Sequence, residues 1–189
     1  SLPRLPGRGS SGMWPSLLVA VAVAVPLASF VLMRLGSVRI TERHHSRHDT
    51  YVIPVAFTRS LVHMMAFMGA MGLFLGLLCS SVFVANPPEV LAFFDAFIVT
   101  TFILWLVLTR YKVSTFEGHM IVTPFVGHDV VVRYDQIERM EWAGFRKGSS
   151  YRDLDVWVGG SHAVRLSALV DLEQILMSID RFDALPSAS

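Results

Sequence analysis

The sequence predicts a membrane protein with three transmembrane helices, followed by a small antiparallel β domain that is closed by one helix. Three observations support this fold class. Three apolar runs of about 20 to 25 residues are each long enough to cross a bilayer as a helix. After the last run, the pattern changes to short alternating strands separated by turn residues. A final segment then has the apolar spacing of an amphipathic helix.

The composition also indicates a chain that is partly solvated by lipid. The 189 residues are 53% hydrophobic and 16% charged, with a mean hydropathy of +0.52, whereas about a quarter of the residues in a soluble domain are charged. Residues 111–189 contain eight basic and eleven acidic side chains. This balance, without a basic stripe, argues against nucleic-acid binding. The single cysteine, Cys79, rules out an intrachain disulfide and a cysteine-based zinc site.

The predicted transmembrane region covers residues 13–110. Its spans lie at residues 14–33, 61–85 and 90–109, with a long loop at residues 34–60. Pro26 lies inside the first span, where a membrane helix tolerates it as a bend. Residues 1–12 have no periodicity and are predicted to be a disordered leader, an expression remnant or a mis-assigned start, in which last case Met13 is the first residue.

The arginines predict the orientation of the chain. The loop at residues 34–60 contains five of them, whereas the link at residues 86–89 contains none. Because basic loops stay on the cytosolic side, the N-terminus is predicted to be external and the C-terminal domain cytosolic. A rival interpretation makes the first span a signal peptide that is cleaved near residues 27–29, which would place the five arginines outside.

Small residues in the second span predict a close helix contact. Gly72, Gly76 and Ser80 recur every four residues and therefore share one helix face, which Gly69 widens. The partner helix is either in the same chain or in a second copy. The alternative is the ordinary enrichment of glycine in membrane helices.

Three polar residues inside the spans are candidate site residues, namely Asp95, His63 and Ser80. A carboxyl group in the bilayer is costly unless it is paired, hydrated or protonated. Counting from the link at residues 87–88 predicts that Asp95 lies opposite Cys79 and Ser80, and that His63 lies near the cytosolic interface. Two roles for Asp95 stay open: a position on a proton or ion pathway, and a structural carboxyl satisfied by Ser80, Ser81 or water.

Residues 111–182 are predicted to form the β domain. Strand-like runs lie at residues 111–115, 119–123, 129–133, 137–146, 151–158 and 162–166. Ser167 then offers a helix cap, and the following apolar positions have helical spacing, at Leu169, Leu172, Leu176 and Ile179. This helix is expected to cover the open end of the β-sandwich. Residues 183–189 are predicted to be a disordered tail.

Three short motifs in this region carry a family resemblance. They are residues 111–115 with Glu117 and Gly118 directly after a span, residues 134–138 before a Trp-bearing strand, and residues 166–169 before the final helix. With these motifs, the chain resembles the bacterial pleckstrin-homology-like (PH-like) domains that are attached to membrane helices. The resemblance implies a binding or assembly module at a bacterial plasma membrane rather than an enzyme.

Lipid-binding PH domains have a basic cluster at their first hairpin loop, and the resemblance places residues 116–119 there. This loop is short and acidic, so no specific phosphoinositide is expected. The basic tip formed by Arg146, Lys147 and Arg152 is expected to contact anionic headgroups as diffuse charge, unless it is simply a solvated hairpin.

The leading functional hypothesis is therefore non-catalytic. A membrane anchor presents a PH-like module that binds another protein, a second copy of the chain or the inner leaflet. The alternatives are an accessory subunit or small carrier with Asp95 on a polar path, and a membrane enzyme. No cofactor and no metal site are predicted. The titratable residues of the domain have no spacing that brings them together, namely His128, Asp129, Asp153, Asp155 and His162.

Overall fold

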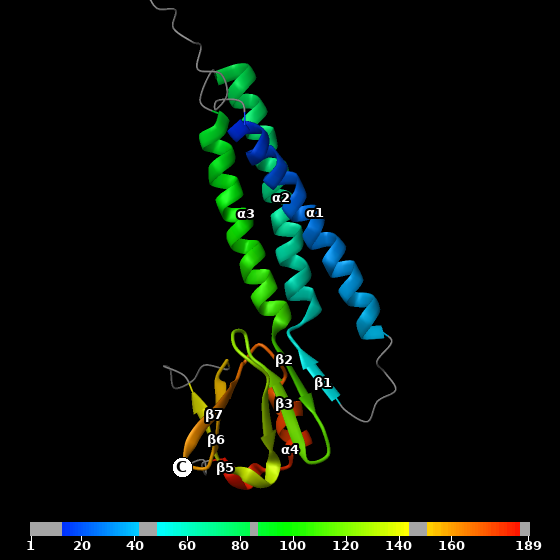
Figure 1. The fold of residues 1–189 in the computed structure, drawn as a ribbon, viewed down its shortest axis with the longest axis vertical. Coiled ribbons are helices and arrows are strands. Elements are labelled where there is room, and N and C mark those ends of the chain that lie inside the picture. Colours follow the sequence, from blue (N-terminus) through cyan, green and yellow to red (C-terminus); the bar gives the residue numbers. More distant parts are fainter. Residues whose placement is uncertain (1–12, 42–48, 84–86, 144–150, 186–189) are drawn as a thin grey trace, which may run out of the picture. The chain divides into compact units, whose positions relative to one another are not determined.

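The computed structural model describes residues 13–41, 49–83, 87–143 and 151–185 (Figure 1). These residues form two compact units. The helical bundle contains the described residues up to Thr41 and those from Arg59 to Trp105. The β domain contains the described residues between Thr41 and Arg59 and those from Leu106 onward. The predicted fold class is confirmed, because the chain combines three long apolar helices with two antiparallel sheets and a C-terminal helix.

The helices are α1 (Met13–Thr41), α2 (Val55–Leu78) and α3 (Pro87–Arg110), and a π-helical turn (Cys79–Phe83) continues α2. All three are long and apolar enough to cross a membrane. Both α1 and α2 extend into the predicted loop at residues 34–60. Hydropathy marks only the part of a helix that lies in hydrocarbon, whereas the backbone hydrogen bonds continue through polar residues beyond it.

The β domain contains two antiparallel sheets. The first has the order β1 (Asp49–Val52), β2 (Lys112–Thr115), β3 (His119–Thr123) and β4 (Val130–Arg133). The second has the order β5 (Ile137–Ala143), β6 (Asp153–Val158) and β7 (Ser161–Leu166). Six of these strands fall on the predicted strand-like runs.

Strand β1 was not predicted, because it lies in the segment between the first two spans. It pairs with β2 in a register that places Val52 opposite Lys112. The hairpin of α2 and α3 is therefore inserted between the first two strands of the domain. This corrects the expectation for the loop at residues 116–119, which is the second connection of the domain and not its first.

The core of the domain lies between the sheets and helix α4 (Leu172–Ile179), which packs against β2. Large side chains fill it, including Tyr111, Met120, Met140, Leu154, Leu166 and Ile175. The predicted cap, Ser167, is wrong. The Asp171 side chain caps α4 by accepting from the Gln174 N–H at 3.1 Å, because residues 167–170 first make a turn.

The expected tail at residues 183–189 is partly ordered. A 3₁₀ turn (Phe182–Ala184) follows α4, and Ala184 is buried. Arg181 holds this turn in place, since its guanidinium donates to the carbonyl oxygens of Tyr134 and Ile137. Residues 186–189 lie outside the described residues.

Candidate functional site

The closest approach in the bundle joins α1 to α2 at Gly69. A methyl group added at Gly69 would lie 2.6 Å from the Ala22 carbonyl oxygen and 3.4 Å from Pro26 Cγ. Pro26 has no N–H and cannot donate to that carbonyl within α1. The proline therefore exposes a backbone oxygen, and the missing side chain at Gly69 lets the α2 backbone cover it.

The predicted small-residue face is partly in a helix contact. A methyl group at Gly72 would lie 2.9 Å from Phe94 Cβ, and one at Gly76 would lie 3.4 Å from Leu91 Cγ. Both glycines thus face α3 of the same chain. Ser80 does not belong to this contact, because it is exposed and its hydroxyl donates to the Leu77 carbonyl at 2.9 Å. The π-helical turn changes the number of residues per turn and rotates Ser80 away from the glycine face.

Asp95 is buried inside the bundle, with 5% of its surface exposed. Within the described residues, neither of its carboxyl oxygens has a hydrogen-bond partner. The expected hydroxyl partners are engaged elsewhere, since Ser80 and Ser81 both donate to the Leu77 carbonyl. A carboxyl group in this position needs a proton, a water molecule or a cation to compensate for its burial.

The expected depth of Asp95 was wrong. Gly72 faces Phe94, so Asp95 lies level with Gly72 and not with Cys79 and Ser80. The count from residues 87–88 fails because the prolines begin α3 and do not form the turn, a position that suits a residue without an N–H. His63 is exposed on α2, and its Nδ1 donates to the Arg59 carbonyl at 2.8 Å.

In the β domain, the outer face of the three-stranded sheet carries two cross-strand rows, which we name the polar sheet face. Arg139, Trp157 and His162 form one row, and Glu141, Asp155 and Arg165 form the other. The Arg139 guanidinium carbon lies 4.5 Å from the centroid of a Trp157 ring. The His162 ring meets Trp157 edge-on, with centroids 5.6 Å apart. In this first row, the Trp157 indole therefore lies between the Arg139 guanidinium and the His162 imidazole.

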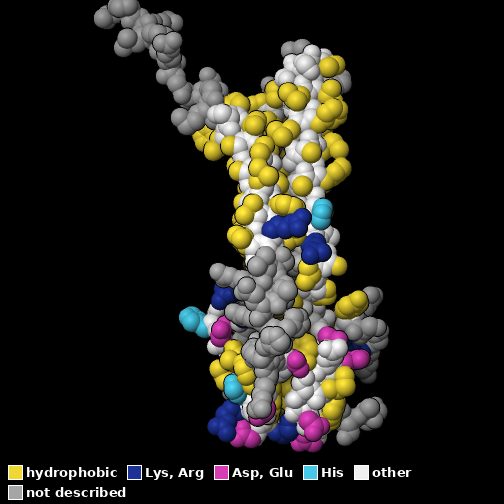
Figure 2. Space-filling view, turned by 90° about the vertical axis from the view of Figure 1, so that its right-hand side faces the viewer, with side chains coloured by type: hydrophobic (Ala, Val, Ile, Leu, Met, Phe, Trp, Pro, Cys, Tyr) yellow, Lys and Arg dark blue, Asp and Glu magenta, His cyan; other side chains and the backbone are white. Residues whose placement is uncertain are grey.

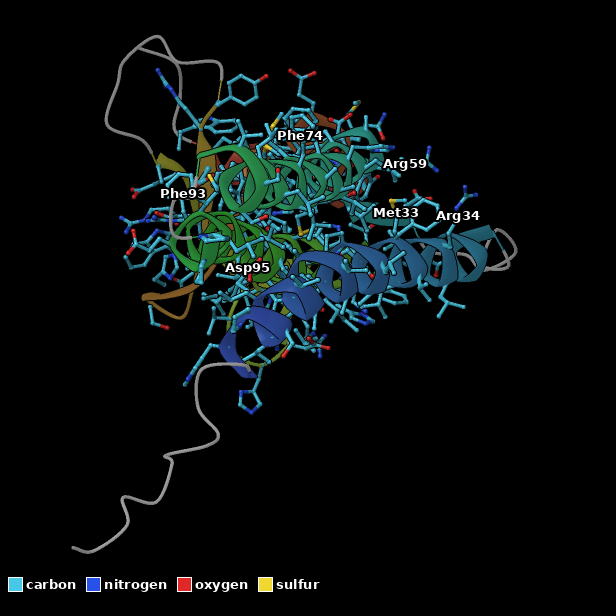
Figure 3. All side chains as sticks on the ribbon, turned by 90° about the horizontal axis from the view of Figure 1, so that it is seen from above. Met33, Arg34, Arg59, Phe74, Phe93 and Asp95 are labelled. Carbon is cyan, nitrogen blue, oxygen red and sulfur yellow. The ribbon has the colours of Figure 1, made fainter. Side chains whose placement is uncertain are left out.

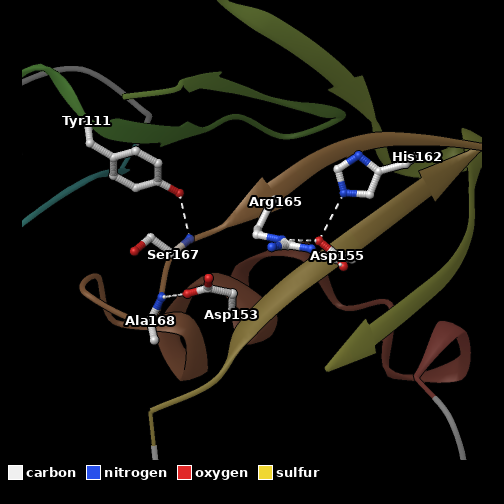
Figure 4. A network of polar contacts seen from close by, with 7 residues as sticks. All are labelled: Tyr111, Asp153, Asp155, His162, Arg165, Ser167 and Ala168. Atoms are coloured by element: carbon white, nitrogen blue, oxygen red, sulfur yellow. Dashed lines mark hydrogen bonds and ion pairs between the residues drawn. The ribbon is translucent and has the colours of Figure 1, made fainter. Parts of the chain in front are cut away.

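Asp155 is the centre of the polar contacts on this face (Figure 4). Arg165 donates to it twice, from Nε at 2.7 Å and from Nη2 at 3.0 Å, and His162 Nε2 donates at 2.9 Å. The hydrogen bond from Arg165 is the main cause that lowers the pKa of the Asp155 carboxyl, while burial opposes the shift. The register places Glu141 opposite Asp155, and the positive charge of Arg165 offsets the repulsion between these two like charges.

A second set of contacts in Figure 4 fixes the segment between β7 and α4. The Ser167 N–H donates to the Tyr111 hydroxyl at 2.8 Å, and the Ala168 N–H donates to Asp153 Oδ1 at 2.8 Å. Burial raises the pKa of the Tyr111 phenol, which therefore stays neutral. These contacts are structural, because they satisfy buried backbone groups.

Two of the predicted headgroup residues, Arg146 and Lys147, lie outside the described residues. Arg152 is described and is partly exposed, just before β6. Within the described ranges, no group of three or more His, Cys, Asp or Glu side chains could hold a metal ion.

Sequence reasoning missed the polar sheet face, although the signal was present. The expectation that Asp155 and His162 stay apart was wrong. The tight turn at Gly159 and Gly160, both with positive φ, fixes a hairpin in which residue 157 lies opposite residue 162. A bulge next to Trp157 then brings His162 within reach of Asp155.

Comparison with known proteins adds no relative. No protein-family model matches the chain, and no curated protein or solved structure matches it either.

Proposed function

We propose that the chain is an integral protein of the bacterial plasma membrane and presents a PH-like binding module to another protein at the cytosolic surface. Three helices of membrane-spanning length support the anchor. Seven antiparallel strands in sheets of four and three, with one C-terminal helix, support the PH-like module. The role is binding and assembly rather than catalysis.

The cytosolic placement of the domain rests on the charges at the helix ends. Arg59 lies in the second turn of α2, shortly after β1, and Arg110 is the last residue of α3, directly before β2. The connection between α2 and α3, at residues 79–86, contains no Lys or Arg. Basic residues at the domain-linked ends and none at the opposite turn support a cytosolic domain under the positive-inside rule.

The observation that carries the binding role is the polar sheet face. Trp and Arg side chains are enriched where interfaces bind most strongly, and here the two already contact each other in the free chain. Arg139 is held by Trp157 and by Glu141, whose carboxylate lies 3.3 Å from Arg139 Nε. Ordered side chains lose little conformational entropy on binding, which favours affinity.

Photo-crosslinking in native membranes tests the proposal. A photoreactive residue replaces His162 on the polar sheet face, and a matched chain has the same residue at Arg133, which is exposed on the other sheet. We expect a discrete adduct from position 162 only, and its loss when Trp157→Ala is added to the same chain. The adduct mass separates a second copy of the chain from a different protein.

Equal adducts from the two positions, or none from position 162, would contradict the proposal. Protease resistance of the Trp157→Ala domain is measured in parallel, because an unfolded domain would also lose the adduct. If the domain unfolds, Arg139→Ala replaces Trp157→Ala, since it removes an exposed side chain from the same row.

A second proposal is that Asp95 lies on a polar path in an accessory subunit or small carrier. The unpartnered carboxyl group favours it. The side chains one turn away from Asp95 on the buried face of α3 are apolar, namely Leu91 and Ile98. Asp95 is therefore an isolated polar position on this part of α3. Proton uptake by proteoliposomes that contain wild-type or Asp95→Asn protein tests this role, and equal uptake would reject it.

A further inference from the structure

Two arginines lie at one depth on neighbouring helices of the bundle. Ser29 Oγ of α1 lies 3.7 Å from Met65 Sδ of α2, and Pro26 of α1 lies next to Gly69 of α2, so the two helices run antiparallel. Arg34 follows Ser29 by five residues and Arg59 precedes Met65 by six. At about 1.5 Å per residue, the two arginines differ in depth by only about 2 Å. Figure 3 shows them labelled at the same side of the bundle, on α1 and α2.

Arg34 has a cation–π contact, and Arg59 has a histidine beside it on α2. The Arg34 guanidinium carbon lies 5.0 Å from the centroid of the Phe30 ring, one turn earlier on α1. His63 lies one turn after Arg59 on the same face of α2. Because His63 Nδ1 donates to the Arg59 carbonyl at 2.8 Å, Nε2 is the ring nitrogen that is left for another partner.

The surroundings combine positive charge with a lipid-facing apolar surface. Neither α1 nor α2 contains an acidic residue. Large apolar side chains near the two arginines are exposed, with fractions of 42% for Phe30, 61% for Leu35 and 46% for Phe57. Figure 2 shows the basic side chains of the bundle gathered among hydrophobic ones. Arg59 lies four residues into α2, and an arginine near the end of a membrane helix extends its charge towards the headgroups.

We propose that Arg34 and Arg59 together bind the phosphate group of an anionic phospholipid across the α1–α2 pair. Each guanidinium offers paired N–H donors that match phosphate oxygens. The acyl chains lie against Phe30 and the neighbouring apolar side chains. The close approach of Gly69 to Ala22 packs the two helices against each other, so the two arginines belong to one helix pair before the lipid binds.

This site differs from the diffuse headgroup contact expected of the basic tip around Arg152. Two guanidinium groups with paired N–H donors recognise the geometry of a phosphate, whereas a diffuse charge responds only to the surface potential. The proposed site therefore binds the phosphate group better with Arg than with Lys, whereas diffuse attraction is the same for both residues.

Native mass spectrometry of the full chain in detergent tests the proposal, with phosphatidylglycerol as the probe and phosphatidylcholine as the zwitterionic reference. We expect the wild-type protein to retain phosphatidylglycerol in preference to phosphatidylcholine. Arg34→Gln/Arg59→Gln should weaken this binding by about tenfold or more, because charge-assisted hydrogen bonds are lost. Arg34→Lys/Arg59→Lys should also weaken it. Two matched single variants each remove one positive charge. Arg59→Gln removes it inside the site, and Arg133→Gln removes it outside the site.

Three results would overturn the site. The double Lys variant could bind like wild type, which would leave diffuse charge as the explanation. Arg133→Gln could weaken binding as much as Arg59→Gln. Inorganic phosphate could displace the lipid at equal concentration, which would make the ligand a free anion and not a phospholipid. Helix content is measured for each variant, and if the double variants unfold, the two single Gln variants carry the same comparison.

Discussion

The helical bundle and the β domain differ in their closest packing, although both bury large apolar side chains, such as Met65 in the bundle. In the bundle, three glycines of α2 allow the closest contacts, and one of them reaches the backbone of α1 at Ala22. In the domain, large side chains such as Met140, Leu154 and Ile175 are fully buried. Lipid gives apolar side chains little reason to leave it, so helices associate through close backbone fit. Water does drive large apolar surfaces together, so the domain depends on their burial.

The comparison predicts that the two regions fail under different mutations. The largest effect is expected for Ile175→Asp, because this side chain is fully buried in α4 and the aspartate would bring an unpaired charge into the core. We expect a loss of about 4 kcal/mol or more and an unfolded domain. The control is Met177→Asp, two residues away on the exposed face of the same helix. Limited proteolysis of the full chain should separate the variants, and equal resistance would refute the packing of α4.

A smaller effect is expected for alanine at the glycines of α2. The order should follow the space for a methyl group, with Gly69→Ala worst, then Gly72→Ala and then Gly76→Ala. Overpacking against a backbone carbonyl costs about 1 to 3 kcal/mol. Gly36→Ala on α1 is the control, because a methyl group there meets nothing within 4 Å. Unfolding of the bundle in mixed detergent measures the series, and a flat series would show that close packing does not hold the helices.

Asp155→Asn is expected to weaken the domain by only about 1 kcal/mol at neutral pH, since Arg165 is largely exposed. The pKa of Asp155 is lowered in the folded state, so its contribution is present above the unfolded pKa. That contribution is lost as the pH falls through the folded pKa. Wild type and variant should therefore converge in acid. The exposed pair of Asp135 with Arg133 is the control, and Asp135→Asn should change stability less at neutral pH.

The least disturbing test concerns β1. Thr50 and Ser114 lie opposite each other, with their hydroxyl oxygens 3.3 Å apart. Cysteines at these two positions, in a chain with Cys79→Ser, should form a disulfide on mild oxidation without loss of stability. Cysteines at Val52 and Ser114 are the control, because this diagonal pair is too far apart to bridge. Bridging by the control pair alone would place β1 in a different register.

The sequence predicted the elements better than their connections. Apolar runs revealed the three helices and alternation revealed six strands, because each signal is local. Strand β1 was not predicted, since its four residues are mostly exposed and two helices separate it in the sequence from its partner β2. The contact of Asp155 with His162 depends on a turn and a bulge, which spacing alone does not show. The depth of Asp95 was misjudged because residues 87–88 begin a helix instead of forming a turn.

The split of the domain by the α2–α3 hairpin has a consequence for biosynthesis. Strand β1 leaves the ribosome before the hairpin, and β2 leaves after it, so the first sheet cannot close until both helices have been made. If only one of the two helices crossed the bilayer, β1 and β2 would lie on opposite sides and could not pair. Such a chain would keep an unpaired sheet edge, which exposes it to aggregation and proteolysis. A domain in which β1 has paired with β2 therefore indicates that α2 and α3 have both been inserted across the bilayer.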